Sequence, residues 1–263
     1  MGVAKNFFDD QFSLQKFGLE HEHCSDFYLC SLQNGRSKLP LFCFRLVLFL
    51  GCIGIIITSF VTYDPGVRFW FIFLTNWGVS LITISCGLSF VVSAIAYFKD
   101  HIESTFGLPW YVKLDWAVYN MAISMALFIT VFYYSFLYGM AQDEEFPVLD
   151  LFVHGMNSVV MVALLVTSRT PSHILHFIYP VGFGVCYMLF SIIYYFANGL
   201  NPFGNPWIYP MVDWSNPGPT TGIVVACIVF LIVLHTFVVL LSRLRDYLTG
   251  MYVRKPYQFE VNE

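Results

Sequence analysis

The chain has 263 residues, of which 57% are hydrophobic, 19% are aromatic and only 11% are charged. Soluble domains carry charge on about a quarter of their residues, so this composition, with a mean hydropathy of +0.67, excludes a soluble globular protein and indicates an integral membrane protein. The net charge of -4 gives no support to a nucleic-acid partner, and the partner that the composition predicts is the lipid bilayer.

Six apolar stretches are long enough to cross a bilayer, whose hydrocarbon core of about 30 Å requires about 20 helical residues. A polar tail without an apolar stretch near Met1 precedes them, so no cleavable signal peptide is expected. The sequence predicts an all-α protein with a tail at 1–40, a transmembrane domain at 41–242 and a second tail at 243–263. The expected spans are 41–62, 68–98, 112–139, 148–168, 174–197 and 219–242.

The distribution of lysine and arginine predicts the orientation. If the N-terminus is cytosolic, twelve of the thirteen basic residues lie on the cytosolic side or at helix ends near it, and only Arg68 lies outside. The acidic residues Asp143, Glu144 and Glu145 then fall in an outer loop. By the positive-inside rule both termini are predicted to be cytosolic.

The outer segment 198–219 contains five prolines, which exclude a regular helix, and several aromatic residues. Loops of this length are usually functional or disordered, and aromatic side chains favour the membrane interface. We therefore expect an ordered cap in which Trp207, Tyr209 and Trp214 settle on the interface or on the helix ends. The same loop surface is the expected site of a protein partner.

The fourth expected span carries a polar stripe in its first half. Asp150, His154 and Asn157 fall within an arc of about 60° on an otherwise apolar helix. An ionisable group at membrane depth costs on the order of 2.5 kcal/mol unless it meets a partner or water, so the stripe marks either a functional site or a helix contact. Asp150, one turn from His154, is suited to orient the imidazole.

Thr75 is expected at the same depth as His154, because each lies about 10 Å below the outer boundary of its span. It belongs to a stripe of small or polar residues that should face the bundle: Thr75, Gly78, Cys86, Ser89 and Ser93. A hydroxyl beside an oriented imidazole is the arrangement of an activated nucleophile. The alternative is that Thr75 bonds its own helix and His154 only satisfies Asp150 or Asn157.

No cofactor or metal site is expected. The seven cysteines have no disulfide or zinc spacing. His173 and His176 could form a metal pair, as could His21 and His23 with Cys24, but histidines at such positions more often meet water, headgroups or packing partners. His235 is expected to be a packed residue of the bundle.

Three motifs resemble the rolling stone family of insects and other invertebrates. They are His176-Phe-Ile-Tyr-Pro180, Ser191-Ile-Ile-Tyr-Tyr195 and, as the most specific, Asn205-Pro-Trp-Ile-Tyr-Pro-Met-Val-Asp-Trp-Ser-Asn-Pro217. The resemblance implies a multi-pass membrane protein connected with myoblast fusion and without an established biochemical activity. Asp213, inside the third motif, is expected to point toward His154.

Two shorter segments are similar to the androgen-induced proteins that hydrolyse fatty-acid esters of hydroxy fatty acids. Phe73-Leu-Thr-Asn76 resembles their threonine segment, and His154-Gly-Met156 their His-Gly-Met-His segment, with Asn157 in place of the last histidine. The similarity implies Thr75 as nucleophile and His154 as base, with a lipid ester as substrate.

Two hypotheses follow for a protein of the plasma membrane or, alternatively, of the endoplasmic reticulum. The first is an intramembrane lipid-ester hydrolase in which Asp150 or Asp213 steers His154. The second is a non-enzymatic fusion or adhesion component whose outer loop recruits a partner.

Overall fold

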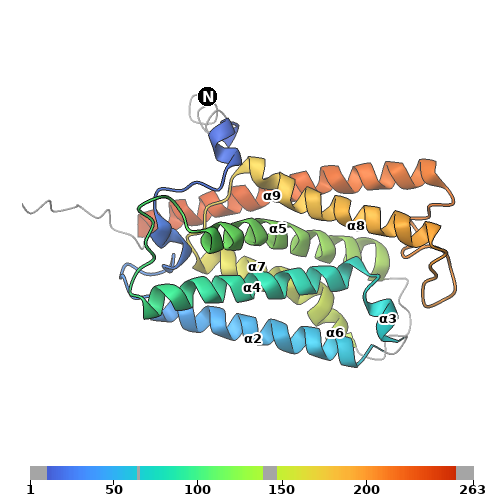
Figure 1. Cartoon of the computed structure of the whole chain (residues 1–263), viewed down its shortest axis with the longest axis horizontal. Coiled ribbons are helices and arrows are strands. Elements are labelled where there is room, and N and C mark those ends of the chain that lie inside the picture. The colour runs from blue at the N-terminus through green and yellow to red at the C-terminus, as the bar shows by residue number, and fades with distance from the viewer. Residues whose placement is uncertain (1–10, 64–65, 139–146, 253–263) are drawn as a thin grey trace, which may run out of the picture.

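The computed structural model describes residues 11–63, 66–138 and 147–252, and these form a bundle of long, roughly parallel helices (Figure 1). Within this part, six helices are long and apolar enough to cross a membrane. The prediction of an all-α protein with six spans is confirmed at this level. The long helices are α2 (Leu39–Val61), α4 (Leu74–Phe98), α5 (Trp110–Phe132), α7 (Met156–Thr167), α8 (Ile178–Phe196) and α9 (Pro217–Tyr252).

Short elements extend or join these helices. The third span continues from α5 through the π-helical turn η3 (Tyr133–Leu137). The fourth begins with α6 (Pro147–Asp150) and the π-helical turn η5 (Leu151–Gly155) before α7, and η6 (Ile174–Phe177) leads into α8. The other short elements are η1 (Leu14–Phe17), η2 (Cys24–Phe27) and α3 (Val67–Trp70).

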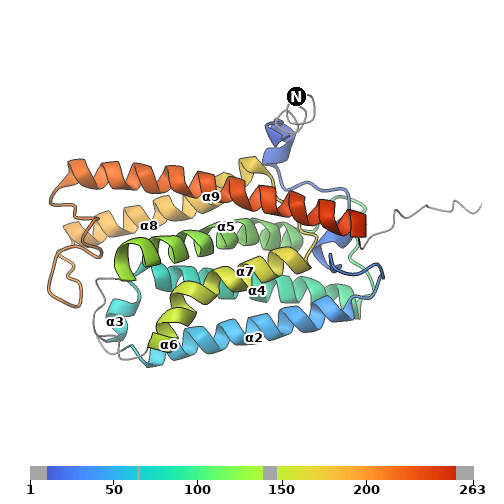
Figure 2. The same cartoon turned by 180° about the vertical axis from the view of Figure 1, so that it is seen from behind.

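An even number of spans brings segment 11–38 and the last turns of α9 to one end of the bundle, here called the tail end (Figures 1 and 2). The opposite end, here called the cap end, carries α3, α6 and the loop 197–216, here called the cap loop. The acidic residues Asp143, Glu144 and Glu145 lie outside the described residues. Helix α9 continues past residue 242 to Tyr252.

Helix α5 is central: it contacts α4, α7, α8 and α9, and its side chains form much of the core. The expected stripe on α4 faces this core, because Gly78, Cys86, Ser89 and Ser93 are all buried and Thr75 is half-buried. Small residues let helix backbones approach closely, and packing of this kind drives helix association in lipid.

The second expected span is not one helix. It breaks after α3, and α4 begins at Leu74 instead of near Arg68. Side chains satisfy three carbonyl groups at the break: Asn76 Nδ2 donates to Trp70 O (2.7 Å), Trp77 Nε1 to Phe71 O (2.7 Å), and Tyr187 Oη to Ile72 O (2.8 Å). A break inside a membrane bundle is stable when its backbone groups find such partners.

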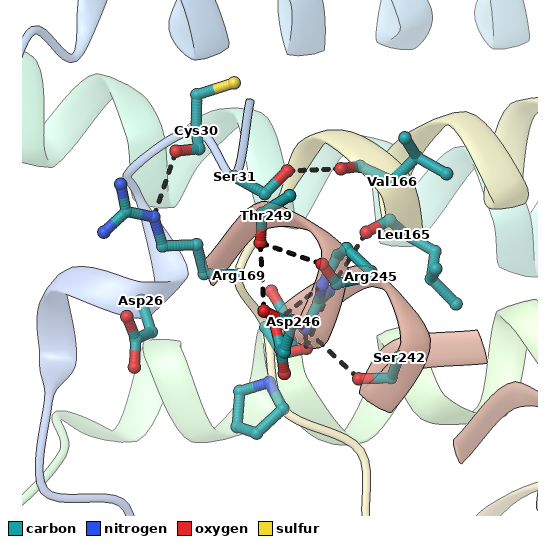
Figure 3. A network of polar contacts seen from close by, with 12 residues as sticks. Asp26, Cys30, Ser31, Leu165, Val166, Arg169, Ser242, Arg245, Asp246 and Thr249 are labelled. Carbon is teal, nitrogen blue, oxygen red and sulfur yellow. Dashed lines mark hydrogen bonds and ion pairs between the residues drawn. The ribbon is translucent and has the colours of Figure 1, made fainter. Parts of the chain in front are cut away.

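Arginine side chains close the tail end (Figure 3). The buried Arg245 of α9 donates to Leu165 O (3.0 Å) and Thr170 O (3.2 Å), where α7 ends. Arg169 donates from Nε to Cys30 O (3.0 Å) in the N-terminal segment. The N-terminal segment is therefore folded onto the bundle.

Aromatic packing adds to this closure. Phe27 and His21 lie edge-on to Trp116 of α5, with ring centroids 5.3 and 6.1 Å apart respectively. Phe27 and Trp116 are fully buried, so segment 11–38 supplies part of a second core at the tail end.

We predict that Gly78→Leu destabilises the bundle, because a side chain there would overlap Ile129 Cδ1 on α5. Overpacking of a core costs about 1–3 kcal/mol, so the melting temperature in a fixed detergent should fall by several degrees. Gly54→Leu on α2 is the matched control, because a Cβ at Gly54 meets nothing within 4 Å. Equal melting temperatures for the two variants would contradict the packing described for α4 and α5.

Candidate functional site

A cavity of about 70 Å³ lies at the cap end between α4, α5, α8 and α9. Residues of the cap loop contribute to its wall, including Tyr209 and Val212. Most of its wall is apolar, formed by side chains such as Phe128, Ile129 and Leu231. Four hydroxyl-bearing side chains also reach it, namely Thr75, Tyr133, Tyr187 and Tyr209. An apolar cavity with a few polar groups is typical of a site that binds and orients an apolar ligand.

Thr75 is the second residue of α4, so it lies in the first turn of this helix and not deep inside a span that begins near Arg68. Its hydroxyl lies beside the phenol oxygen of Tyr209, as does the hydroxyl of Tyr187. Tyr209 also accepts a hydrogen bond from the backbone N–H of Leu74 (3.0 Å). The cap loop therefore meets the candidate nucleophile directly.

His154 lies in the π-helical turn η5 at the same end of the bundle. Its Nε2 is 3.2 Å from Asp150 Oδ1, so the expected contact between these two residues is present. Its Nδ1 is buried without a hydrogen-bond partner in the described part of the chain. The imidazole stacks on the ring of Tyr133 with centroids 3.5 Å apart and planes 4° from parallel.

Two π-helical turns face each other here, because Tyr133 begins η3 and His154 belongs to η5. Thr130 Oγ1, in the last turn of α5 before η3, donates to His154 O (2.6 Å) and lies 2.7 Å from Ser158 Oγ. A π-helical turn leaves backbone groups without regular partners and is frequent at functional sites. Neither turn, nor the stacking of Tyr133 on His154, has a signal in the sequence.

Thr75 and His154 are not hydrogen-bonded to each other in the structure. Tyr133 connects the two residues, because it lines the same cavity as Thr75 and its ring stacks on His154. Asn157 is buried, and its amide donates to Val153 O of its own helical segment. The three residues of the polar stripe therefore have different contacts: Asn157 bonds to its own helix, whereas Asp150 and His154 contact each other.

The carboxylate of Asp213 is engaged in a turn at the start of α9. It accepts hydrogen bonds from Ser215 N (2.9 Å), Ser215 Oγ (2.7 Å) and Asn216 Nδ2 (3.0 Å). The bond from the Ser215 hydroxyl is the main cause of its lowered pKa. No hydrogen bond or ion pair joins it to His154 among the described residues, so its position stabilises the cap loop.

The cap loop is ordered by other contacts as well. Trp214 Nε1 donates to Ser191 Oγ on α8 (3.0 Å), and Asn201 Oδ1 accepts from the backbone N–H groups of Phe203 and Asn205 (2.9 Å each). The ring of Tyr209 lies edge-on to Phe73, 5.8 Å away between centroids. These contacts agree with the expected settling of aromatic residues on the helix ends.

The tail-end histidines are packing residues in this structure. His173 and His176 lie edge-on to each other and to Trp116, and burial lowers the pKa of His173 to about 3, so its ring is neutral at pH 7. His235 lies within hydrogen-bond distance of Ser124 Oγ (3.0 Å) and His173 O (2.9 Å). Among the described residues no three His, Cys, Asp or Glu side chains are grouped to hold a metal ion.

Six apolar spans around a small cavity with a loop over one end define a multi-pass helical membrane protein. The family model described as "Rost: Protein rolling stone" matches residues 3–257. Protein rolling stone of Drosophila melanogaster is 30% identical over 223 residues, which cover 80% of this chain and 79% of that protein. No solved structure matches the chain. The chain belongs to the rolling stone family, as its motifs predict.

Proposed function

We propose that this protein is an intramembrane lipid-ester hydrolase with Thr75 as its nucleophile. The observation that carries the proposal is the exposure of Thr75 to the apolar cavity beneath the cap loop. An acyl chain would lie among Phe128, Ile129 and Leu231 and present its ester group to the Thr75 hydroxyl. Burial of apolar chain atoms would supply the binding energy.

His154 is the proposed general base. A proton on Nε2 would face Asp150, which leaves the Nδ1 lone pair free to take the proton of Thr75. Oγ of Thr75 attacks the acyl carbon, the alcohol leaves with the proton held by His154, and water then releases the fatty acid from Thr75. Because Tyr133 touches both the cavity and His154, its side chain must move or relay this proton. Catalytic hydrogen bonds often become short only when substrate is bound.

We place the tail end in the cytosol. Ten of the thirteen lysines and arginines lie in the described residues. Nine of these ten are in segments at the tail end, and the tenth, Arg68, is in α3 at the cap end. This distribution follows the positive-inside rule. The cavity would then face the outer leaflet of the plasma membrane, or the lumenal leaflet of the endoplasmic reticulum. Ester hydrolysis in the outer leaflet would alter lipid packing where membranes meet during cell fusion.

A second candidate function is a non-enzymatic fusion or adhesion component. It is favoured by Phe203 in the cap loop, whose side chain is 86% exposed although the loop around it is anchored. An ordered loop that presents a bare aromatic ring is suited to recruit a protein partner, because aromatic anchors dominate interface energies.

The orientation can be tested with epitope tags. Tags at both termini should resist protease added to intact cells, or to sealed microsomes if the protein resides in the endoplasmic reticulum. A tag inserted at Gly204, which is exposed and has no neighbour within 4 Å of a Cβ position, should be cleaved. The opposite pattern would invert the proposed topology.

For catalysis, we expect Thr75→Ala and His154→Ala each to slow hydrolysis of a long-chain lipid ester by about 1,000-fold or more, because residues that act as a unit lose nearly all activity together. Thr75→Ser should retain part of the activity, and Asn157→Ala most of it. Thr83→Ala is the matched control, since the Thr83 hydroxyl donates to Val79 O of its own helix (2.8 Å).

Fatty-acid release by purified protein, together with labelling by a fluorophosphonate probe, measures these effects. Undiminished turnover by Thr75→Ala, or the absence of turnover by folded wild-type protein across a broad lipid panel, would refute the hydrolase.

The adhesion hypothesis makes a different prediction. Phe203→Ala should reduce cell–cell fusion without slowing ester hydrolysis, because it removes the exposed ring and leaves the cavity intact. Phe196→Ala, at the exposed end of α8, serves as the control. Normal fusion with Phe203→Ala and impaired fusion with Thr75→Ala would exclude adhesion through this loop.

A further inference from the structure

Tyr209 has an unusual position for a loop residue. Its phenol oxygen accepts the N–H of Leu74 (3.0 Å) and lies beside the hydroxyls of Thr75 and Tyr187, at the wall of the cavity. The hydroxyl of Tyr187 donates a hydrogen bond to Ile72 O (2.8 Å). Tyr209 thus brings a second hydroxyl to the side of the candidate nucleophile.

This geometry places the O–H group of Tyr209 beside the hydroxyl of Thr75. A phenol oxygen that accepts an N–H still carries its own O–H, and accepting a hydrogen bond makes that O–H a stronger donor. Burial raises the pKa of Tyr209, so the phenol keeps its proton at neutral pH. A donor held in a largely apolar environment stabilises a nearby negative charge more strongly than it would in solution.

We propose that Tyr209 is a catalytic residue, whose O–H donates to the carbonyl oxygen of an ester bound at Thr75. This role rests on the proposed hydrolase function. When Thr75 Oγ bonds to the acyl carbon, the π electron pair of the C=O bond moves onto the carbonyl oxygen and the Thr75 proton passes to His154. Tyr209 stabilises the resulting oxyanion and keeps its own proton. The C=O bond then re-forms, and the alkoxide leaves with the proton from His154.

The role makes the cap loop part of the active site. Trp214 and Asp213 fix the loop to α8 and to the start of α9, and the Tyr209 ring packs on Phe73 next to Thr75. Such anchoring keeps the donor in place before the reaction, which is the condition for effective oxyanion stabilisation.

Tyr209→Phe tests the proposal because it removes only the hydroxyl. We expect kcat to fall by about 100-fold with KM changed by less than about threefold, because the lost hydrogen bond is much stronger to the oxyanion of the transition state than to the carbonyl oxygen of the bound ester. Tyr194→Phe is the matched control, since its hydroxyl ties the cap loop at Leu200 O (2.8 Å) away from the cavity lining. A kcat within about threefold of wild type, or a loss confined to KM, would overturn the role of Tyr209 and leave the hydrolase standing.

Binding provides a readout that needs no turnover. A long-chain alkyl boronic acid forms a tetrahedral adduct with a hydroxyl nucleophile and places an oxygen where the oxyanion develops, whereas the matching alcohol does not. Tyr209→Phe should lower the affinity for the boronic acid by about 10-fold or more and leave the affinity for the alcohol unchanged. Equal weakening of both ligands would assign Tyr209 to cap packing alone.

A second variant covers the case in which Tyr209→Phe fails to fold. Incorporation of 3,5-difluorotyrosine at position 209 keeps the size of the side chain but gives a more acidic phenol. Activity should then fall at alkaline pH values where wild type stays active, because an ionised phenol cannot donate. An unchanged pH profile would count against the donor role. Inactive wild-type protein would overturn the hydrolase and this inference together.

Discussion

The absence of water in the hydrocarbon of a bilayer is the constraint on which this structure depends, because a polar group inside the bundle is costly unless it finds a protein partner. The buried guanidinium of Arg45 shows the solution at the tail end. It donates to Phe27 O (2.8 Å), Ser89 O (2.9 Å) and Ser93 Oγ (2.7 Å), so one side chain ties the N-terminal segment to α2 and α4. Ser89 in turn donates to the buried Asp115 of α5 (2.7 Å). Removal of one member would leave the others without partners at low dielectric, which makes such networks specific as well as costly to disturb.

The same constraint explains the position of Thr75. A helix can stop after Trp70 and restart at Leu74 only because Asn76, Trp77 and Tyr187 take the free carbonyl groups and Tyr209 takes the free N–H of Leu74. The partner of that N–H comes from a loop more than 130 residues later in the chain. Formation of the cap loop and the start of α4 are therefore coupled, and the cavity wall between them is complete only when both are in place.

Hydropathy was enough to predict six spans, because length and apolar composition act locally, and residue spacing predicted both the buried stripe on α4 and the contact between Asp150 and His154. The break at 71–73 was not predictable in this way, since Phe71-Ile72-Phe73 contains neither glycine nor proline and the side chains that stabilise it are brought there by the fold. The two π-helical turns and the stack of Tyr133 on His154 also depend on contacts between spans. Asp213 was expected to point at His154, but its neighbours Ser215 and Asn216 offer nearer donors.

The irregular backbone of this protein is unevenly distributed, and the distribution bears on function. At membrane depth, non-helical or π-helical backbone is tolerated only where it is buried in protein or lines a cavity. Three irregular segments lie at the cap end, namely the break before α4, the turn η3 and the turn η5. Thr75, just after the break, and Tyr133 of η3 line the cavity, and His154 of η5 stacks on Tyr133. The tail end is instead closed by Arg45, Arg245 and the packed N-terminal segment. π-Helical turns are frequent at functional sites, so the concentration of irregular backbone around one cavity supports the proposal that the cap end holds the functional site.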